Sequence, residues 1–344
     1  MAEKYSRWRD PATGVQPFLA PLPASTDSLP PLIQVVTLPF GTVLGGIRTL
    51  LVVLLLLAQT VLVEGAYAPL RVFPPVHAAL TRAANAGIAR LTLAVLGIVW
   101  INVETVQLRK TGRSPPKLPF DPEKGDLIVA NSSSYVDLLY LAFRHNAVFI
   151  LPVSSANGKI VGWRRVGLLA AVWSSGALPQ PYKGAESLSN ALKNAPGPVV
   201  LFPECTTSNN RALLKIPELA PPTKGSKGRI FVLAFKRVSF SRQHYACNDL
   251  LARRYPQPTR LASSLTYPIP SSSLIRLPLA HIWSLTSRLT PYTFTVRRLH
   301  PSESPTSWES IGETLTRTAR LKKVVGLGWV EKGAFLEFRR VKGR

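Results

Sequence analysis

The sequence predicts an α/β fold, with a mainly parallel sheet flanked by helices, preceded by an N-terminal apolar helix that acts as a membrane anchor. Three observations predict it. Apolar strand-like runs alternate with helix-like segments after residue 125, as in a sheet covered on both faces. An apolar stretch of spanning length precedes them, from Thr42 to Val63. Two polar loops follow strand-like runs, where ligands of open α/β sheets bind.

The N-terminal third contains the predicted anchor. Residues 1–40 are rich in Pro, Ser and Thr and are expected to form an extended arm. Arg48 is the single charge within residues 42–63, and its stem is expected to snorkel towards the interface. Four consecutive leucines leave this helix no polar face, which favours lipid over the alternative of a buried core helix.

A second apolar stretch, Ala86 to Val103, follows a polar break from Glu64 to Asn85. Three arrangements are open for it: a second membrane crossing, a dip into one leaflet, or packing on the soluble domain. We therefore assign residues 41–104 to an anchoring helix or helical hairpin and residues 105–344 to the α/β domain. Lys and Arg are dense after residue 108, which predicts a cytosolic location for that domain.

The α/β domain is expected to begin after a Pro/Lys-rich linker at residues 111–124, and a Ser/Pro/Arg-rich insertion is expected near residues 253–280. Apolar runs predict strands at Asp126–Ala130, Ala147–Val153, Pro198–Pro203 and Arg229–Arg237, and alternation of residue type predicts one at Thr290–Leu299. Amphipathic or capped segments predict helices at Asp137–His145, Gly184–Asn194 and Trp308–Leu321, the last with Thr306 or Ser307 as its cap.

Composition restricts the classes of partner and cofactor. The chain has 42 Lys and Arg against 18 Asp and Glu, a net charge of +24, which indicates an anionic membrane face or nucleic acid. No nucleic-acid-binding motif is recognisable, so membrane is favoured and nucleic acid is not expected as a partner. Two cysteines exclude a disulfide framework, no residue cluster predicts a metal site, and the polar N-terminus predicts no cleaved signal peptide.

The two polar loops contain the candidate site. The first reads N-S-S-S-Y-V-D from Asn131 to Asp137, and the second reads F-P-E-C-T-T-S-N from Phe202 to Asn209. From the residues alone, Ser134 and Asp137 have the form of a capping box at a helix start, so Asp137 has a structural interpretation. Glu204 also has a structural interpretation, as a carboxylate that forms a salt bridge with a Lys or Arg.

The loops resemble two motifs of the glycerolipid (lysophospholipid) acyltransferase superfamily, N-H-x-x-x-x-D and F-P-E-G-T. The opening E-K-Y-S-R-W-R-D and the block F-P-E-C-T-T-S-N-N-R are also similar to a fungal branch of it. The resemblance implies that Asp137 is catalytic and that the loops bind substrate. The substrate-binding residues it implies are Asn131, Glu204, Thr206, Thr207 and Ser208, with Arg211 as the nearest guanidinium for a phosphate or, alternatively, a solvated surface charge.

The chain departs from the family pattern at three positions. Cys205 replaces a glycine and is expected to narrow the pocket. Gln180 stands where a basic residue is expected. Arg164, Arg165 and Lys183 are candidates to replace that charge, although Arg164 and Arg165, beside Trp163, are favoured as membrane-facing charges.

The third departure concerns the reaction directly, because Ser132 occupies the position of the family's catalytic histidine. A serine hydroxyl does not accept a proton at neutral pH without an activator. Three hypotheses follow: another base acts, either Asp137 or a histidine such as His145, His244 or His281; Ser132 carries the acyl group transiently; or the fold binds lipid without turnover.

The resemblance implies a membrane-bound acyltransferase of glycerolipid synthesis. It would move a fatty acyl group from acyl-CoA, a co-substrate, to lysophosphatidic acid or a related lysophospholipid, with no cofactor. The expected location is the endoplasmic reticulum membrane or the lipid droplet surface, with the soluble domain in the cytosol. The alternative function is a non-catalytic lipid-binding or scaffold protein. The enzyme hypothesis requires the loops of Asp137 and Glu204 to meet over one cavity. It fails if the two carboxylates lie on opposite faces, or if both are sealed beneath packed side chains with no entrance.

Overall fold

The computed structural model describes residues 3–19, 31–67, 69–109, 118–155, 157–221, 228–236, 265–270, 278–288, 291–305 and 307–342. The predicted linker and the predicted insertion lie partly outside these ranges. His244 and Thr306 lie outside them as well.

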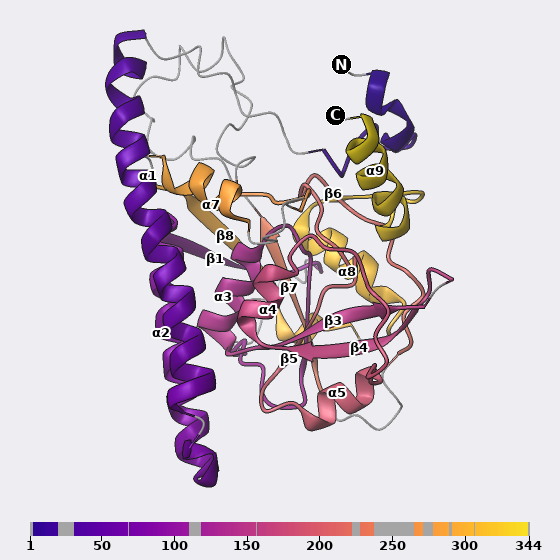
Figure 1. The fold of residues 1–344 in the computed structure, drawn as a ribbon. Helices are drawn as coiled ribbons and strands as arrows, with labels where there is room; N and C mark the ends of the chain where they lie inside the picture. The colour runs from indigo at the N-terminus through magenta and orange to yellow at the C-terminus, as the bar shows by residue number, and fades with distance from the viewer. Residues whose placement is uncertain are drawn as a thin grey trace.

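A seven-stranded mixed sheet forms the centre of the molecule, in the order β1-β8-β7-β2-β5-β3-β4 (Figure 1). Strand β2 pairs in parallel with β5 and β7, β3 pairs in parallel with β5, and β1 pairs in parallel with β8. The β7–β8 and β3–β4 pairs are antiparallel. The predicted α/β fold with a mainly parallel sheet is therefore confirmed. The strands are β1 (Trp100–Val106), β2 (Leu127–Ala130), β3 (Val148–Ser154), β4 (Ile160–Val166), β5 (Val199–Leu201), β7 (Ile230–Lys236) and β8 (Thr293–Leu299).

Helices cover both faces of this sheet, which explains why every residue of β2 is buried. One face packs against α3, and α2 packs in turn on α3. The other face packs against α5 and α8. The helices are α1 (Pro31–Thr60), α2 (Pro74–Val95), α3 (Tyr135–His145), α4 (Leu168–Trp173), α5 (Leu188–Asn194), α7 (Leu279–Thr286), α8 (Ser310–Ala319) and α9 (Trp329–Lys342).

The predicted anchor helix exists, but its boundaries differ from the prediction. Helix α1 begins at Pro31 rather than Thr42, so the expectation that residues up to 40 lack regular structure is wrong for its last ten residues. Pro31 is tolerated because the first turn of a helix needs no backbone donor there. Arg48 does not snorkel. Its guanidinium donates to the carbonyl oxygens of Thr286 (3.4 Å) and Arg288 (3.0 Å), and so ties α1 to α7.

The second apolar stretch packs on the α/β domain. Helix α2 already begins at Pro74, inside the expected polar break, with prolines in its first turn. After it ends, Leu96 and Ile98 are fully buried, and the chain enters the sheet as β1. Within the described ranges, one helical segment, Pro39–Val63, is long and apolar enough to cross a membrane by length and composition.

Several elements were not predicted. The antiparallel edge strand β4, the helices α4, α7 and α9, and a two-stranded sheet of β6 (Ala212–Leu213) and β9 (Lys322–Lys323) have no counterpart in the sequence analysis. The predicted cap of α8 is wrong at Ser307, because Glu309 occupies the N-cap position and makes no side-chain cap.

The N-terminal segment packs against the C-terminal helix, and both lie at the same end of the molecule in Figure 1. The ring of Trp8 lies 5.4 Å from that of Phe335 and 4.7 Å from that of Phe338, measured between centroids. Phe18 is 1% exposed and contacts the same helix through Phe335. This aromatic cluster fixes α9, which contributes a residue to the candidate site.

Candidate functional site

The loop after β2 forms the predicted helix cap. The side chain of Ser134 accepts from the backbone N–H of Val136, and Asp137 accepts from the backbone N–H of Ser134, which completes a capping box at the start of α3. One carboxylate oxygen of Asp137 also accepts from the backbone N–H (2.8 Å) and the hydroxyl (2.7 Å) of Ser133. Asp137 is fully buried, so its carboxylate holds the loop together from within.

Asn131 connects this loop to the neighbouring strand. Its side-chain oxygen accepts from the backbone N–H of Phe235 (2.7 Å), and its amide nitrogen donates to the carbonyl of the same residue (3.2 Å) and to Asn210 (2.9 Å). Asn131 is 1% exposed. Asn131, a predicted substrate-binding residue, therefore connects the end of β2 to β7.

The two motif loops meet, as the sequence predicted. The carboxylate of Glu204 accepts from the backbone N–H of Ser132 in the first loop (2.9 Å) and from that of Leu214 (3.0 Å). The backbone N–H of Ser208 donates to the carbonyl of Ser132 (3.0 Å). Burial raises the pKa of Glu204 to about 7, against the opposing effect of these donors. Glu204 is fully buried and is not among the residues that line the cavity at these loops.

Lys332 of α9 contacts the second motif loop. Its ammonium group is fully buried and lies within hydrogen-bonding distance of the hydroxyls of Thr206 (2.8 Å) and Thr207 (3.2 Å) and of the carbonyls of Thr207 (2.8 Å) and Gly176 (3.3 Å). Burial lowers the pKa of Lys332 to about 7, and the charge of Glu204 opposes that shift. The structural interpretation of Glu204 required a carboxylate paired with Lys or Arg. Within the described residues Glu204 forms no ion pair with a basic side chain, and Lys332 acts on it only through the electrostatic effect of its charge.

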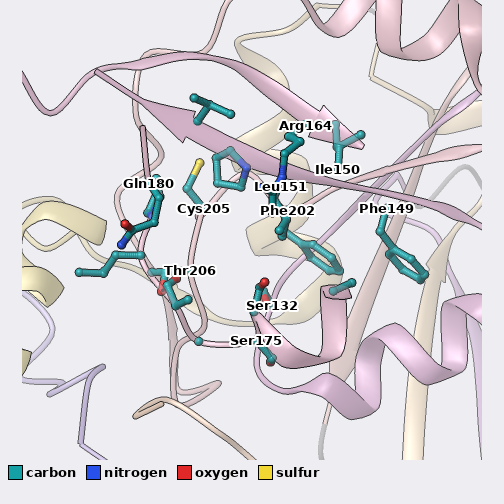
Figure 2. Close-up of a pocket in the computed structure, with 18 of the residues that line it drawn as sticks. Ser132, Phe149, Ile150, Leu151, Arg164, Ser175, Gln180, Phe202, Cys205 and Thr206 are labelled. Carbon is teal, nitrogen blue, oxygen red and sulfur yellow. Dashed lines mark hydrogen bonds between the residues drawn. The ribbon is translucent and has the colours of Figure 1, made fainter. Parts of the chain in front are cut away.

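A cavity of about 280 Å³ adjoins the junction of the two loops (Figure 2). Its walls expose more apolar than polar surface, as is typical of pockets for small molecules. Ser132, Thr206 and Thr207 are the predicted site residues that line it. The apolar walls come from Leu138, Phe149, Ile150, Leu151, Pro152, Val153, Ala171, Leu178 and Phe202.

The threonines at the cavity already use their hydroxyls within the protein. Thr207 donates to the carbonyl of Tyr267 (2.7 Å), and Thr206 lies 3.3 Å from the carbonyl of Ala177. Ser208 is buried, and its hydroxyl accepts from the backbone N–H of Asn210. Arg211 is exposed and does not line the cavity. The structure therefore brings the second loop to the cavity mainly through Thr206 and Thr207.

Three histidines were candidates for the general base: His145, His244 and His281. The structure places His145 and His281 outside the lining of the cavity. His145 is half-buried beside the rings of Phe120 and Tyr140, and desolvation lowers its pKa to about 3, with Arg298 and Arg144 acting in the same direction. His281 lies with its Nδ1 3.0 Å from the hydroxyl of Tyr135. Neither residue lines the cavity, and no described histidine does. His244 is not among the described residues.

The departures from the family pattern all lie at the cavity. Cys205 lines it and has a φ of +56°, the left-handed conformation that glycine adopts without strain. Gln180 and Arg164 line it as well, whereas Arg165 pairs with Glu186 at 3.0 Å. Arg164 thus occupies a position in the cavity wall, and its interpretation as a membrane-facing charge stays a prediction.

Two residues that hold the second loop in place, Lys332 and Asn209, were missed by the sequence analysis. Lys332 lies 128 residues after Glu204, in a helix that was not predicted, so no local signal indicated it. Asn209, the last residue of the second loop, donates through its side chain to the carbonyls of Gln16 (2.7 Å) and Leu19 (3.0 Å). The similarity of the N-terminal segment to the fungal branch was the one signal that this segment belongs to the site.

Comparison with known proteins supports the resemblance over the whole length of the chain. No family model matches the sequence. The chain is 25% identical, over 345 residues that cover 99% of both proteins, to the Schizosaccharomyces pombe protein named "Putative lysophosphatidic acid:oleoyl-CoA acyltransferase". Among solved structures, it is similar to the 1-acyl-sn-glycerophosphate (LPA) acyltransferase PlsC from Thermotoga maritima, with 15% identity, a TM-score of 0.37, and coverage of 80% of this chain and 97% of that one.

Proposed function

We propose that this protein is a membrane-bound acyltransferase that esterifies lysophosphatidic acid or a related lysophospholipid with a fatty acyl group from acyl-CoA. The lysolipid hydroxyl oxygen forms an ester bond with the acyl carbonyl carbon as the carbon–sulfur bond of the thioester breaks. The hydroxyl proton leaves with the thiol of CoA, so the reaction needs no further co-substrate.

One observation carries this proposal: the two motif loops are hydrogen-bonded to each other at the edge of an apolar cavity, with Ser132 facing it. The Schizosaccharomyces pombe relative, which matches over 99% of both chains, supports lysophosphatidic acid as the substrate class, because its name contains that substrate. The apolar walls suit a fatty acyl chain, because burial of each methylene in such a wall stabilises the complex by about 0.8 kcal/mol.

The proposed location is the cytosolic face of the endoplasmic reticulum membrane or the lipid droplet surface. The apolar helix α1 supports membrane association, because Val43, Ile47, Leu50, Leu54 and Leu57 are all exposed on it. The net charge of +24 favours an anionic membrane face.

In this proposal, the buried carboxylates position the site and do not contact substrate. Asp137 fixes the loop of Ser132, and Glu204 joins that loop to Thr206 and Thr207. The cavity then orients the lysolipid hydroxyl against the thioester, and orientation alone supplies a large part of the rate enhancement of such a transfer.

The direct test is acyl transfer by the purified full-length protein in detergent–lipid micelles, with labelled oleoyl-CoA and lysophosphatidic acid. We expect labelled phosphatidic acid and release of free CoA in equal amounts. Ser132→Ala is expected to reduce the rate at least 10-fold if the hydroxyl at the cavity participates, with Ser155→Ala, on a loop away from the cavity lining, as the matched control. Labelled product equal to that of protein-free micelles would refute transfer.

A second candidate function, lipid binding without turnover, is favoured by one specific observation. Asp137 and Glu204 are both buried and hydrogen-bonded inside the protein, and no described histidine lines the cavity. Ser132→His separates the two functions. Activity that appears only in this variant identifies a protein that retained binding and lost its base, whereas reduced activity in it identifies a working enzyme adapted to serine.

A further inference from the structure

Behind the wall of the cavity, the side chain of Lys332 is hydrogen-bonded to a hydroxyl that lines the cavity. The hydroxyl belongs to Thr206, which Figure 2 shows among the lining residues. Lys332 is 0% exposed and is not part of the lining, but its Nζ atom lies 2.8 Å from Oγ1 of Thr206. A buried amine therefore contacts the cavity through a threonine hydroxyl.

The hydrogen bonds of protonated Lys332 follow from its surroundings. The ammonium group has three donors. It donates to the carbonyl oxygens of Thr207 (2.8 Å) and Gly176 (3.3 Å) and to Oγ1 of Thr206. The hydroxyl of Thr206 then donates to the carbonyl of Ala177, 3.3 Å away. In this state, the hydroxyl proton of Thr206 is directed away from Lys332.

Loss of one proton from Lys332 reverses its bond with Thr206. The two remaining N–H donors go to the two carbonyl oxygens, because a carbonyl only accepts. The lone pair of the amine then needs a donor. Thr207, whose hydroxyl lies 3.2 Å from the amine, donates its proton to the carbonyl of Tyr267 (2.7 Å). Among the described partners of Lys332, the hydroxyl of Thr206 is therefore the one that remains to donate to the amine.

The charge state of Lys332 changes near neutral pH. Burial lowers its pKa to about 7, and the charge of Glu204, the one charged group among the described residues that shifts this pKa, opposes the effect. A proton acceptor works best when its pKa is close to the pH at which the protein works. Arg164, the cation of the cavity wall, stays protonated, and burial raises the pKa of Cys205, so neither side chain accepts a proton.

We propose that Thr206 and Lys332 form the proton-transfer pair of this site, with Thr206 in contact with the substrate hydroxyl and Lys332 as the proton acceptor behind it. This inference rests on the proposed function, for which it supplies the base that Ser132 does not provide. As the lysolipid oxygen bonds to the acyl carbonyl carbon, its proton passes to Oγ1 of Thr206, and the proton of Thr206 passes to Nζ of Lys332. The carbon–sulfur bond breaks, and the same path returns a proton to the thiolate of CoA.

The first test compares acyl transfer by Thr206→Val, Thr206→Ser and Thr318→Val in the full-length protein. Valine has the shape of threonine but no hydroxyl, so Thr206→Val interrupts the path to Lys332 and should lower kcat about 100-fold, with binding of lysophosphatidic acid unchanged. Thr206→Ser restores the hydroxyl and should recover most of the rate. Thr318→Val is the matched control and should keep the wild-type rate, because Thr318 is also buried and its hydroxyl bonds to the carbonyl of Thr314 in its own helix.

The pH profile separates proton transfer from a purely structural role of Lys332. In the wild type, kcat/KM should rise with pH and level off above the pKa of Lys332, about 7, because the neutral amine is the active form. Glu204→Gln removes the charge that raises this pKa, so the rise should move to lower pH. Glutamine keeps a side-chain oxygen for the backbone N–H groups of Ser132 and Leu214. A lysine that only holds the loop in place would not make the profile respond to Glu204 in this way.

Wild-type kcat in Thr206→Val would overturn the proton-transfer pair, and so would an equal loss of rate in Thr318→Val. A profile of Glu204→Gln with an unchanged midpoint, or without any rise, would also overturn it, because a lost rise belongs to Glu204 itself. Because the Thr206 variants leave the charges of the site in place, they test the pair even if Glu204→Gln does not fold. All these results leave acyl transfer, and with it the proposed function, standing, whereas absence of labelled product from the wild type refutes the function and the pair together.

Discussion

At the scale of single residues, the polar groups of the two motifs serve mainly to hold the loops in place. Asp137, Asn131 and Glu204 are each at most 1% exposed and bind backbone groups. A buried polar group without a partner costs about 1–3 kcal/mol, so each of these bonds restricts where the loops can lie. Ser132, in contrast, reaches the cavity only because its neighbours are fixed in this way.

Lys332 gives the first prediction at this scale. Lys332→Met removes the donor to Thr206 and Thr207 and leaves the buried Glu204 without its compensating charge. A buried acceptor left without its donor costs about 1–3 kcal/mol, so the free energy of unfolding should fall by at least that order in chemical denaturation. The control is Lys322→Met, an exposed residue, which should change it by less than about 0.5 kcal/mol. The double variant Glu204→Gln/Lys332→Met should recover part of the loss.

The same pair predicts a dependence of stability on pH. The pKa of Glu204 in the folded protein, about 7, lies above its ordinary value of 4.5, so its contribution is present at low pH and is lost as the pH rises from 4.5 through 7. The pKa of Lys332, about 7, lies below its ordinary 10.5, so its contribution increases as the pH rises from 7 towards 10.5. In Lys332→Met, the fall in Tm should remain and extend above pH 7, because the charge that lowers the pKa of Glu204 is gone, and the rise that Lys332 causes above pH 7 should disappear. A wild-type pH profile in that variant would contradict the assignment.

At the scale of elements, the site depends on contacts between segments that are far apart in the sequence. The cap of α3 positions the first loop, β5 ends at the second, and α9 supplies Lys332. The N-terminal segment holds α9 through Trp8 and holds the second loop through the bonds of Asn209 to Gln16 and Leu19. A residue near the start of the chain is therefore expected to affect the cavity.

Trp8→Ala tests this expectation. Trp8 is 5% exposed, and truncation of a buried tryptophan costs about 3–5 kcal/mol of unfolding free energy. We expect that loss in chemical denaturation, together with faster proteolysis of residues 3–19 and weaker lipid binding. Trp100→Ala is the matched control, because this side chain is 72% exposed and its loss should leave the stability nearly unchanged. Equal stability of the two variants would show that the aromatic cluster does not hold α9.

At the scale of the whole molecule, the α/β domain and the apolar helix form one structure. Helix α1 runs along one side of the molecule, where it packs against α2 and α7 (Figure 1). Its other side exposes apolar residues at helical spacing, from Val43 to Val61. An arrangement of this kind predicts that the domain lies close to the bilayer rather than at the end of a flexible linker.

The prediction at this scale concerns membrane binding. Leu50 and Leu54 are 60% and 50% exposed on α1, and an Asp at the centre of a membrane-spanning helix costs about 2.5–3.5 kcal/mol. Leu50→Asp/Leu54→Asp should therefore release the protein from liposomes in a flotation assay. Val325→Asp, an exposed apolar position far from α1 in the sequence, should leave flotation unchanged. Flotation of the double variant with the liposomes would show that α1 is not the membrane-binding element.

The sequence predicted those parts of the fold that short-range patterns encode. The strands β2, β3, β5 and β7 were recognisable because buried parallel strands are continuous apolar runs, and β8 was recognisable from its alternation of apolar and polar residues. The cap at Ser134 and Asp137 was recognisable because its partners are three residues apart. Strand β1 was assigned to an apolar helical stretch, because a short apolar segment fits either structure until its partner, β8, is known.

The sequence by itself determined the fold class, the apolar helix and the two loops that meet, because each follows from local periodicity or from the order of strands in a sheet. Only the tertiary structure decided which side chains reach the cavity. It buried Asp137 and Glu204, left Arg211 outside, and brought in Arg164 and Lys332. The physical reason is that the surroundings of a side chain depend on packing between segments that are remote in the chain. The spacing of residues along the sequence does not predict that packing.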